Sequence, residues 1–112
     1  MTQLVNYVRQ LCASKQIGRV AVDITRRSYP TVWNRVRARV FKMSPAEARG
    51  YIRARAFEVI ENEIDALMKY APRLDSWFRL SVRDRAIDEI TGLILADLSS
   101  SRRLAPSYRR AA

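Results

Sequence analysis

Arginine is the side chain with the clearest chemical capacity in this sequence, and five arginines gather between residues 26 and 40. A guanidinium group stays charged at neutral pH and donates paired hydrogen bonds to phosphate or carboxylate. The stretch therefore favours binding of nucleic-acid phosphates or of an acidic protein surface. The ordinary alternative is a core helix whose outer face is solvated. The five residues are Arg26, Arg27, Arg35, Arg37 and Arg39.

The net charge of +10 over 112 residues is concentrated at the two ends of the chain. Residues 1–43 hold nine basic residues and one acidic residue, and residues 99–112 hold four basic residues and no acidic one. Arginine makes up most of the basic residues, which also fits a GC-rich genome. We predict that nucleic acid, DNA before RNA, or an acidic protein binds these ends. A solubilising role for the C-terminal end is the alternative.

The residues that catalysis or metal binding requires are scarce. The chain has no histidine and a single cysteine, Cys12, so a Cys-His nucleophile and a histidine-containing zinc site are excluded. Glu58, Glu61 and Asp65 share a helical face, but arginines nearby can pair with them. We predict no enzymatic activity, no catalytic residue, no metal site and no cofactor. The lone cysteine fits a reducing compartment.

Length and composition favour an all-α fold. The sequence predicts a small single-domain helical bundle of four main helices, with a basic N-terminal part and a flexible basic C-terminal tail. Glycine and proline are few, and the apolar runs are too short to span a bilayer. We expect a cytoplasmic location, nucleoid-associated if the protein binds DNA. The amphipathic, basic N-terminus loosely matches an organellar transit peptide as an alternative.

Apolar spacing predicts the N-terminal helices. Residues 2–13 form an amphipathic helix, residues 14–18 interrupt it, and residues 18–25 fit either a strand or, preferably, a short helix. Residues 26–30 are a turn in which Ser28 caps the next helix and Pro30 lies in its first turn. That helix covers 31–42, and its apolar face is Val32, Trp33, Val36, Val40 and Phe41.

The second half of the chain predicts a helical hairpin. Ser44, Pro45 and Glu47 form a capping box that starts a helix over 45–70. Its inward stripe is Ala48, Ile52, Ala56, Val59, Ile60, Ile64, Leu67 and Met68. A short helical turn over 74–80 then precedes a last helix, which begins at a second box of Ser81 and Asp84. Its inward residues are Ile87, Ile90, Leu93, Ile94 and Leu98.

The predicted domain therefore spans 1–98, with basic helices over 1–43 and the hairpin over 44–98. Residues 99–112 lack periodicity and are expected to be a mobile basic tail. Arginines flanking Tyr108 in this tail could bind phosphates and stack on bases. These arginines are Arg102, Arg103, Arg109 and Arg110.

The segment SYPTVWNRVRAR, within residues 17–41, resembles the recognition helix of helix-turn-helix DNA-binding proteins. The resemblance implies that Ser28 caps the helix and that Val32, Trp33 and Val36 pack inward. It places two groups of residues on DNA. Tyr29, Thr31, Asn34 and Arg35 would face the major groove, whereas Arg26, Arg27, Arg37 and Arg39 would hold phosphates.

Two functions follow as hypotheses. The first is a small homodimeric nucleic-acid-binding protein, a DNA-binding regulator or architectural factor that uses the helix at 31–42, aided by Arg102 and Arg103. The alternative is a non-enzymatic helical adaptor or assembly subunit that dimerises or docks in a larger complex. One exposed surface shared by the five arginines between residues 26 and 40 would favour DNA reading, whereas a dispersed arrangement would favour an ordinary solvated helix face.

Overall fold

Three α-helices form the fold. The computed structural model describes residues 2–70 and 76–111, with side chains described for 15–69 and 76–101. The described residues contain no strand, and the three helices are α1 (Thr2–Val40), α2 (Pro45–Tyr70) and α3 (Ser76–Ala111). The all-α class is therefore confirmed, whereas the prediction of four main helices is wrong.

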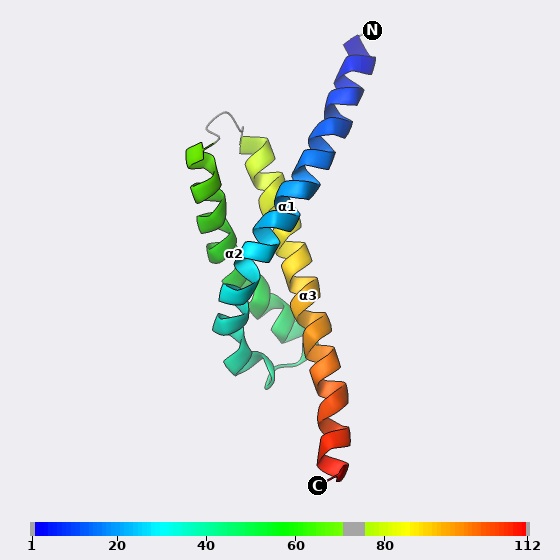
Figure 1. The fold of residues 1–112 in the computed structure, drawn as a ribbon, viewed down its shortest axis with the longest axis vertical. Coiled ribbons are helices and arrows are strands. Elements are labelled where there is room, and N and C mark those ends of the chain that lie inside the picture. The colour runs from blue at the N-terminus through cyan, green and yellow to red at the C-terminus, as the bar shows by residue number, and fades with distance from the viewer. Residues whose placement is uncertain (1, 71–75, 112) are drawn as a thin grey trace.

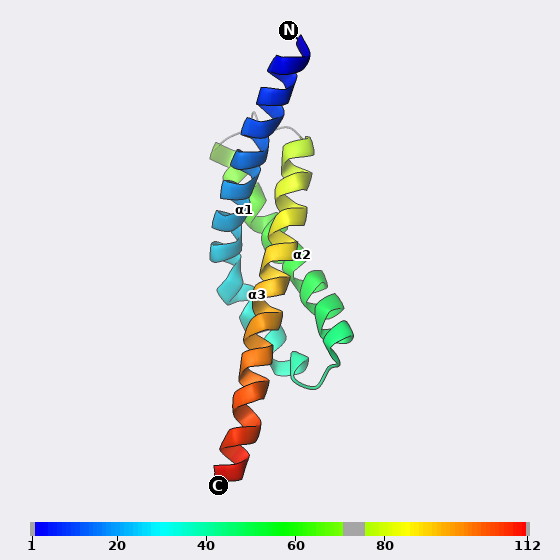
Figure 2. The same ribbon diagram turned by 90° about the vertical axis from the view of Figure 1, so that its right-hand side faces the viewer.

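Each helix packs against the other two. Figures 1 and 2 show α2 running antiparallel to α1 and α3, so that the chain goes down, up and down again. Over the part of the chain that the structure describes, no helix is both long and apolar enough to cross a membrane.

The core is built from side chains that recur every fourth residue along each helix. Such rows form ridges, and ridges of this spacing pack best when the helix axes cross at an angle. The crossing of α1 over α3 is visible in Figure 1. Alanine or serine occurs in every row, which lets the helices approach closely. The rows are Ile24, Ser28, Val32, Val36 and Val40 in α1, Ala48, Ile52, Ala56, Ile60 and Ile64 in α2, and Val82, Ala86, Ile90, Ile94 and Leu98 in α3.

Helix α1 is continuous, so the predicted interruption at 14–18 and the predicted turn at 26–30 are both wrong. Ser28 is not a cap, because it lies within the helix with no exposed surface and belongs to the buried row of α1. Pro30 is also inside the helix. Because proline lacks an N–H and its ring crowds the preceding turn, it bends a helix without always ending it. Figure 1 shows α1 changing direction in its cyan part.

The helical interpretation of residues 18–25 is confirmed, because they lie inside α1. In the predicted apolar face of 31–42, Val32, Val36 and Val40 are buried and Trp33 is half-buried. Phe41 is half-exposed and meets Trp33 edge-on, with ring centroids 6.4 Å apart. The apolar face of the amphipathic helix predicted over residues 2–13 falls on side chains outside the described ones.

The predicted start of α2 is confirmed. The backbone N–H of Glu47 donates to the Ser44 hydroxyl oxygen at 3.3 Å, and that hydroxyl donates to the Glu47 carboxylate at 3.1 Å. The helix begins at Pro45, whose missing N–H costs nothing in the first turn. The stripe of α2 is also as predicted from Ala48 to Ile64, while Leu67 and Met68 are half-buried.

Helix α3 is longer than predicted at both ends. It begins at Ser76, so the separate short helix and the second capping box at Ser81 are wrong. It continues to Ala111, so residues 99–111 are helical, whereas the mobility expected of this basic tail stays a prediction. Extending an existing helix needs no new nucleus, which favours continuation through residues with adequate helix propensity. Leu93, predicted inward, is 51% exposed.

The ends of α1 and α3 give the molecule an elongated shape. The N-terminal part of α1 and the C-terminal part of α3 extend beyond the bundle at opposite poles (Figures 1 and 2). The principal extents are 68 × 28 × 20 Å, and the radius of gyration is 17.7 Å. A compact domain of this length would have a radius of gyration of about 13 Å.

Tyr29 ties α1 to α3 and gives the fold a testable pH dependence. Its hydroxyl donates to the Asp97 carboxylate, and burial, aided by Asp97, raises the pKa of Tyr29 from 10.0 to about 12. A folded pKa above the unfolded value means that the stabilising contribution is complete below pH 10 and is lost as pH rises through about 12.

We therefore expect the unfolding free energy of the wild type to fall between pH 10 and about 12, relative to that of Tyr29→Phe. Denaturant titrations across this pH range measure the difference. Asp97→Asn keeps the burial and should reduce, rather than remove, the dependence. Parallel pH profiles for the wild type and Tyr29→Phe would contradict the prediction.

Candidate nucleic-acid interface

A hollow of about 310 Å³ between α1 and α2 gathers three arginines and a tyrosine. Arg35 and Arg39 lie one turn apart on α1, and Tyr51 and Arg55 lie one turn apart on α2. Residues four apart share a helix face, so each helix presents its pair to the other. We call this feature the basic hollow.

The charge in the basic hollow is only partly neutralised. Arg35 Nη1 lies 3.4 Å from Glu58 Oε2, in a pair whose side chains are 46% and 66% exposed. The Arg55 guanidinium lies over the Tyr51 ring, 5.4 Å from its centroid. Among the described side chains, Arg39 and Arg55 have no carboxylate partner. Three guanidinium charges therefore face one carboxylate, and the surplus can attract an anion.

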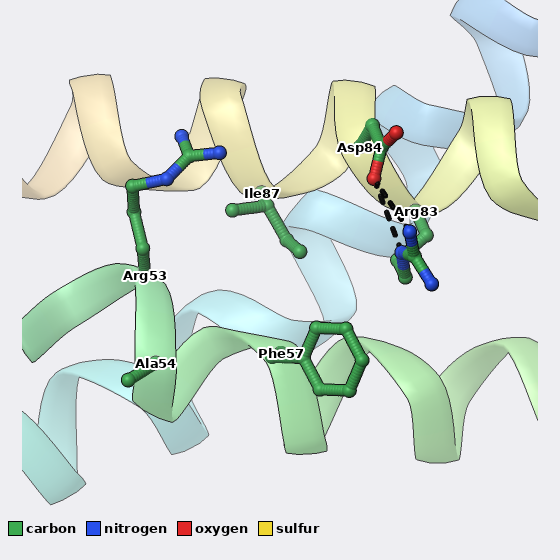
Figure 3. Close-up of a pocket in the computed structure, with 6 residues that line it drawn as sticks. All are labelled: Arg53, Ala54, Phe57, Arg83, Asp84 and Ile87. Atoms are coloured by element: carbon green, nitrogen blue, oxygen red, sulfur yellow. Dashed lines mark hydrogen bonds and ion pairs between the residues drawn. The ribbon is translucent and has the colours of Figure 1, made fainter. Parts of the chain in front are cut away.

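A second hollow, of about 500 Å³, lies between α2 and α3 and has balanced charges (Figure 3). Arg53 Nη1 lies 2.5 Å from Oδ1 of Asp88. Arg83 pairs with Asp84 at 3.0 Å and lies over the Phe57 ring at 5.2 Å. Because both arginines already have carboxylate partners, this hollow is better explained as helix packing than as an anion site.

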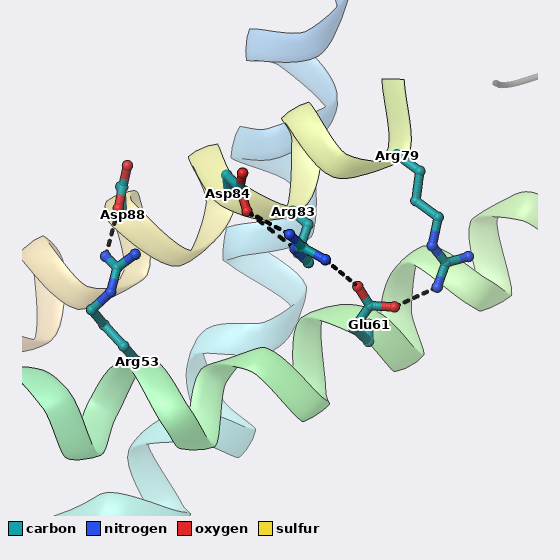
Figure 4. Close-up of polar contacts among 6 residues, drawn as sticks. All are labelled: Arg53, Glu61, Arg79, Arg83, Asp84 and Asp88. Atoms are coloured by element: carbon teal, nitrogen blue, oxygen red, sulfur yellow. Dashed lines mark hydrogen bonds and ion pairs between the residues drawn. The ribbon is translucent and has the colours of Figure 1, made fainter. Parts of the chain in front are cut away.

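Two acidic side chains of α2, Glu61 and Asp65, join α2 to α3, and Figure 4 shows Glu61 between Arg79 and Arg83. Glu61 accepts from Arg79 at 2.5 Å and lies 3.7 Å from Arg83, and Asp65 pairs with Arg79 at 2.6 Å. The hydrogen bonds to Glu61 and then Asp65 raise the pKa of Arg79 above its ordinary value. The arginine partners thus come from α3 rather than from along α2. Among the described residues, no group of three or more His, Cys, Asp or Glu could hold a metal ion.

The five predicted arginines of α1 do not form one surface. Arg35 and Arg39 face α2 in the basic hollow, whereas Arg26 lines a groove against α3. Arg27 is paired with Asp23 on its own helix at 3.4 Å. Arg37 is exposed. This dispersion counts against a single face that enters a DNA groove.

The helix-turn-helix resemblance is overturned by the fold. That arrangement needs two helices joined by a turn, and residues 17–41 lie almost wholly in the uninterrupted α1. Tyr29, expected to face DNA, is instead bonded to Asp97 of α3. Thr31 and Asn34 are exposed, as expected for contact residues. The side chains of Arg102 and Arg103 lie outside the described ones.

Tyr51 and Arg55 were missed from the sequence. The sequence does contain a signal for them. Arg35 and Arg39 precede the helix start at Ser44 with a spacing of four, and Tyr51 and Arg55 follow it with the same spacing. A hairpin folded at that point brings such pairs face to face. Whether the two pairs meet depends on which side of its helix each pair occupies relative to the core. Only the packed helices reveal this.

Comparison with protein-family models, with curated proteins and with solved structures finds no match to this chain. The geometry and charge of the basic hollow are therefore the features that bear on function.

Proposed function

We propose that this protein is a non-enzymatic nucleic-acid-binding protein that holds the phosphate backbone in its basic hollow. The observation that supports this most is a pair of arginines, Arg39 and Arg55, which have no carboxylate partner among the described side chains and lie on opposite walls of the hollow. Two guanidinium groups that converge from separate helices suit a phosphate, which accepts several hydrogen bonds at once. In this role the helix at 31–42 contributes Arg35 and Arg39 to the phosphate site and does not read bases.

Each residue of the hollow has a separate role in this proposal. Arg39 and Arg55 bind the phosphate oxygens. Arg35, which is half-exposed, exchanges its 3.4 Å contact with Glu58 for a second phosphate. Tyr51 supports the Arg55 guanidinium through its ring. The same ring can stack against a base that leaves the stack of a nucleic-acid duplex. Binding of this kind positions a backbone and carries little sequence preference.

Surrounding charge supports the same site. Lys42 and Arg49 are exposed on either side of the Ser44 helix start, and no ion pair of theirs occurs among the described side chains. Their positive field would raise the local concentration of a polyanion before contact is made. The concentration of positive charge in residues 1–43 adds to this field.

A salt series of fluorescence anisotropy titrations with a short duplex DNA tests the proposal. Neutralising two or three phosphates predicts a slope of about −2 to −3 in a plot of log affinity against log salt. The double variant Arg39→Gln with Arg55→Gln should lose about tenfold or more in affinity at low salt, and its slope should be shallower by about 2.

The matched control removes the same charge elsewhere. Arg27→Gln with Arg85→Gln replaces two exposed arginines that are each paired along their own helix. We expect this variant to change affinity by no more than about twofold. Equal losses in the two double variants would refute a localised site, and binding no tighter than millimolar would refute the function. Single-stranded DNA and RNA probes assign the preferred nucleic acid.

A further inference from the structure

A groove of about 480 Å³ between α1 and α3 exposes apolar side chains from both helices. Val22 of α1 is 42% exposed and Leu93 of α3 is 51% exposed, and both line this groove. Single exposed apolar residues are ordinary, but two that line one groove mark a surface suited to a partner. We call it the α1–α3 groove, and its other lining residues are Thr25, Arg26, Asp88, Glu89 and Gly92.

Gly92 leaves part of the groove open. A Cβ added there would meet no atom within 4 Å, so no described residue requires a glycine at this position. A mid-helix glycine costs about 0.5–1 kcal/mol relative to alanine. Gly18 is different, because the Arg85 guanidinium would lie 3.3 Å from a Cβ there. Gly92 would instead allow a helix from outside to approach the backbone of α3.

The two lips of the groove carry opposite charges. Arg26 lies on the α1 lip and has no carboxylate partner among the described side chains, whereas Asp88 and Glu89 lie on the α3 lip. Asp88 uses its Oδ1 for Arg53, which leaves Oδ2 free of a described partner. Glu89 is shared between Arg85 and the buried Thr25.

This charge pattern is self-complementary. If two copies meet face to face about a two-fold axis along the groove, the α1 lip of each copy faces the α3 lip of the other. Arg26 of each copy then meets Asp88 of the other copy, so the same ion pair forms twice. An axis across the groove would place Arg26 against Arg26, which is repulsive. Figures 1 and 2 show α1 and α3 running in the same direction, so the favoured axis gives a parallel four-helix contact.

We infer that the α1–α3 groove is a homodimer interface that a second copy of this chain covers with its own groove. Val22 and Leu93 become buried, and the helix of the second copy passes close to Gly92. The interface does not use the basic hollow, which lies on the flank of α1 that faces α2. Dimerisation can therefore fail or succeed independently of nucleic-acid binding.

Sedimentation velocity of the full chain over a concentration series tests the interface. Arg26→Glu should weaken the dimer about tenfold or more, because like charges then face each other. Adding Asp88→Arg to this variant should restore most of the affinity, as expected for a direct pair. A wild-type chain that is monomeric throughout, or a charge swap that restores nothing, would overturn the inference.

A glycine pair supplies a control for folding. Gly50 and Gly92 are both exposed inside a helix, and a Cβ at either meets nothing within 4 Å. Gly92→Leu should abolish association, whereas Gly50→Leu should leave the mass unchanged. Both variants should keep their helical circular dichroism. Equal effects of the two substitutions on mass would place the contact elsewhere, and the DNA affinity of both variants reports separately on the basic hollow.

Discussion

Replacing Ile60 by alanine is expected to lower the free energy of unfolding by about 2–5 kcal/mol. Ile60 has no exposed surface and lies in the middle of the α2 row, between Ala56 and Ile64. The core cluster to which it belongs draws residues from all three helices, so we expect the cavity to close only if a whole helix moves. Small domains have total stabilities of about 5–15 kcal/mol, so this one change removes a large share.

Denaturant unfolding followed by circular dichroism measures the loss. Ile60→Val removes one methylene and should cost only about 0.5–1.5 kcal/mol, which makes a graded series. Leu80→Ala is the control, because Leu80 is 45% exposed and its truncation should cost much less than Ile60→Ala. Similar losses at Ile60 and Leu80 would contradict the core described here.

The parts of the fold that could be predicted are those with strong local signals. Ser44, Pro45 and Glu47 define the start of α2 through side-chain chemistry within a single turn. The α2 stripe is predictable as well, because apolar residues at helical spacing need no knowledge of the partner helix. Both signals depend only on residues close together in sequence.

The course of α1 could not be predicted in the same way. Ser28 and Pro30 are typical of a helix start, and local chemistry gives no reason to set that signal aside. What overrides it is the buried row that passes from Ile24 through Ser28 to Val32. A serine that caps a helix and a serine that lets two helices cross closely look the same in a sequence. Only tertiary packing distinguishes the two roles.

The pairing of charges in the candidate site could not be predicted from the sequence for the same reason. The surplus of positive charge in residues 1–43 is visible in the sequence, but it does not reveal which arginines are neutralised. Arg35 meets Glu58 from another helix, and Arg53 meets Asp88 in the same manner. The arginines of the hollow that have no carboxylate partner among the described side chains, Arg39 and Arg55, become apparent only after such cross-helix pairs are assigned.

Ser28 and Ser44 offer a direct test of the distinction between a buried serine and a capping serine. Replacement by alanine should have opposite effects on stability at the two positions. Ser44 caps α2, so Ser44→Ala should lower the free energy of unfolding by about 0.5–2 kcal/mol. Ser28 is buried within α1, and its hydroxyl has no hydrogen-bond partner among the described residues. Ser28→Ala removes this unsatisfied group and improves helix propensity, so stability should rise by about 0.5–1 kcal/mol.

A larger side chain at position 28 gives a further test. Leucine at 28 must fit into a site with no exposed surface, so Ser28→Leu should cost about 1–3 kcal/mol through overpacking. Paired denaturant titrations of the three variants against the wild type give the signs. A loss of stability in Ser28→Ala equal to that in Ser44→Ala would mean that Ser28 caps a helix, and would reinstate a turn before residue 31. A gain means that α1 passes through Ser28 unbroken, which fixes Arg35 and Arg39 on the flank that faces Tyr51 and Arg55.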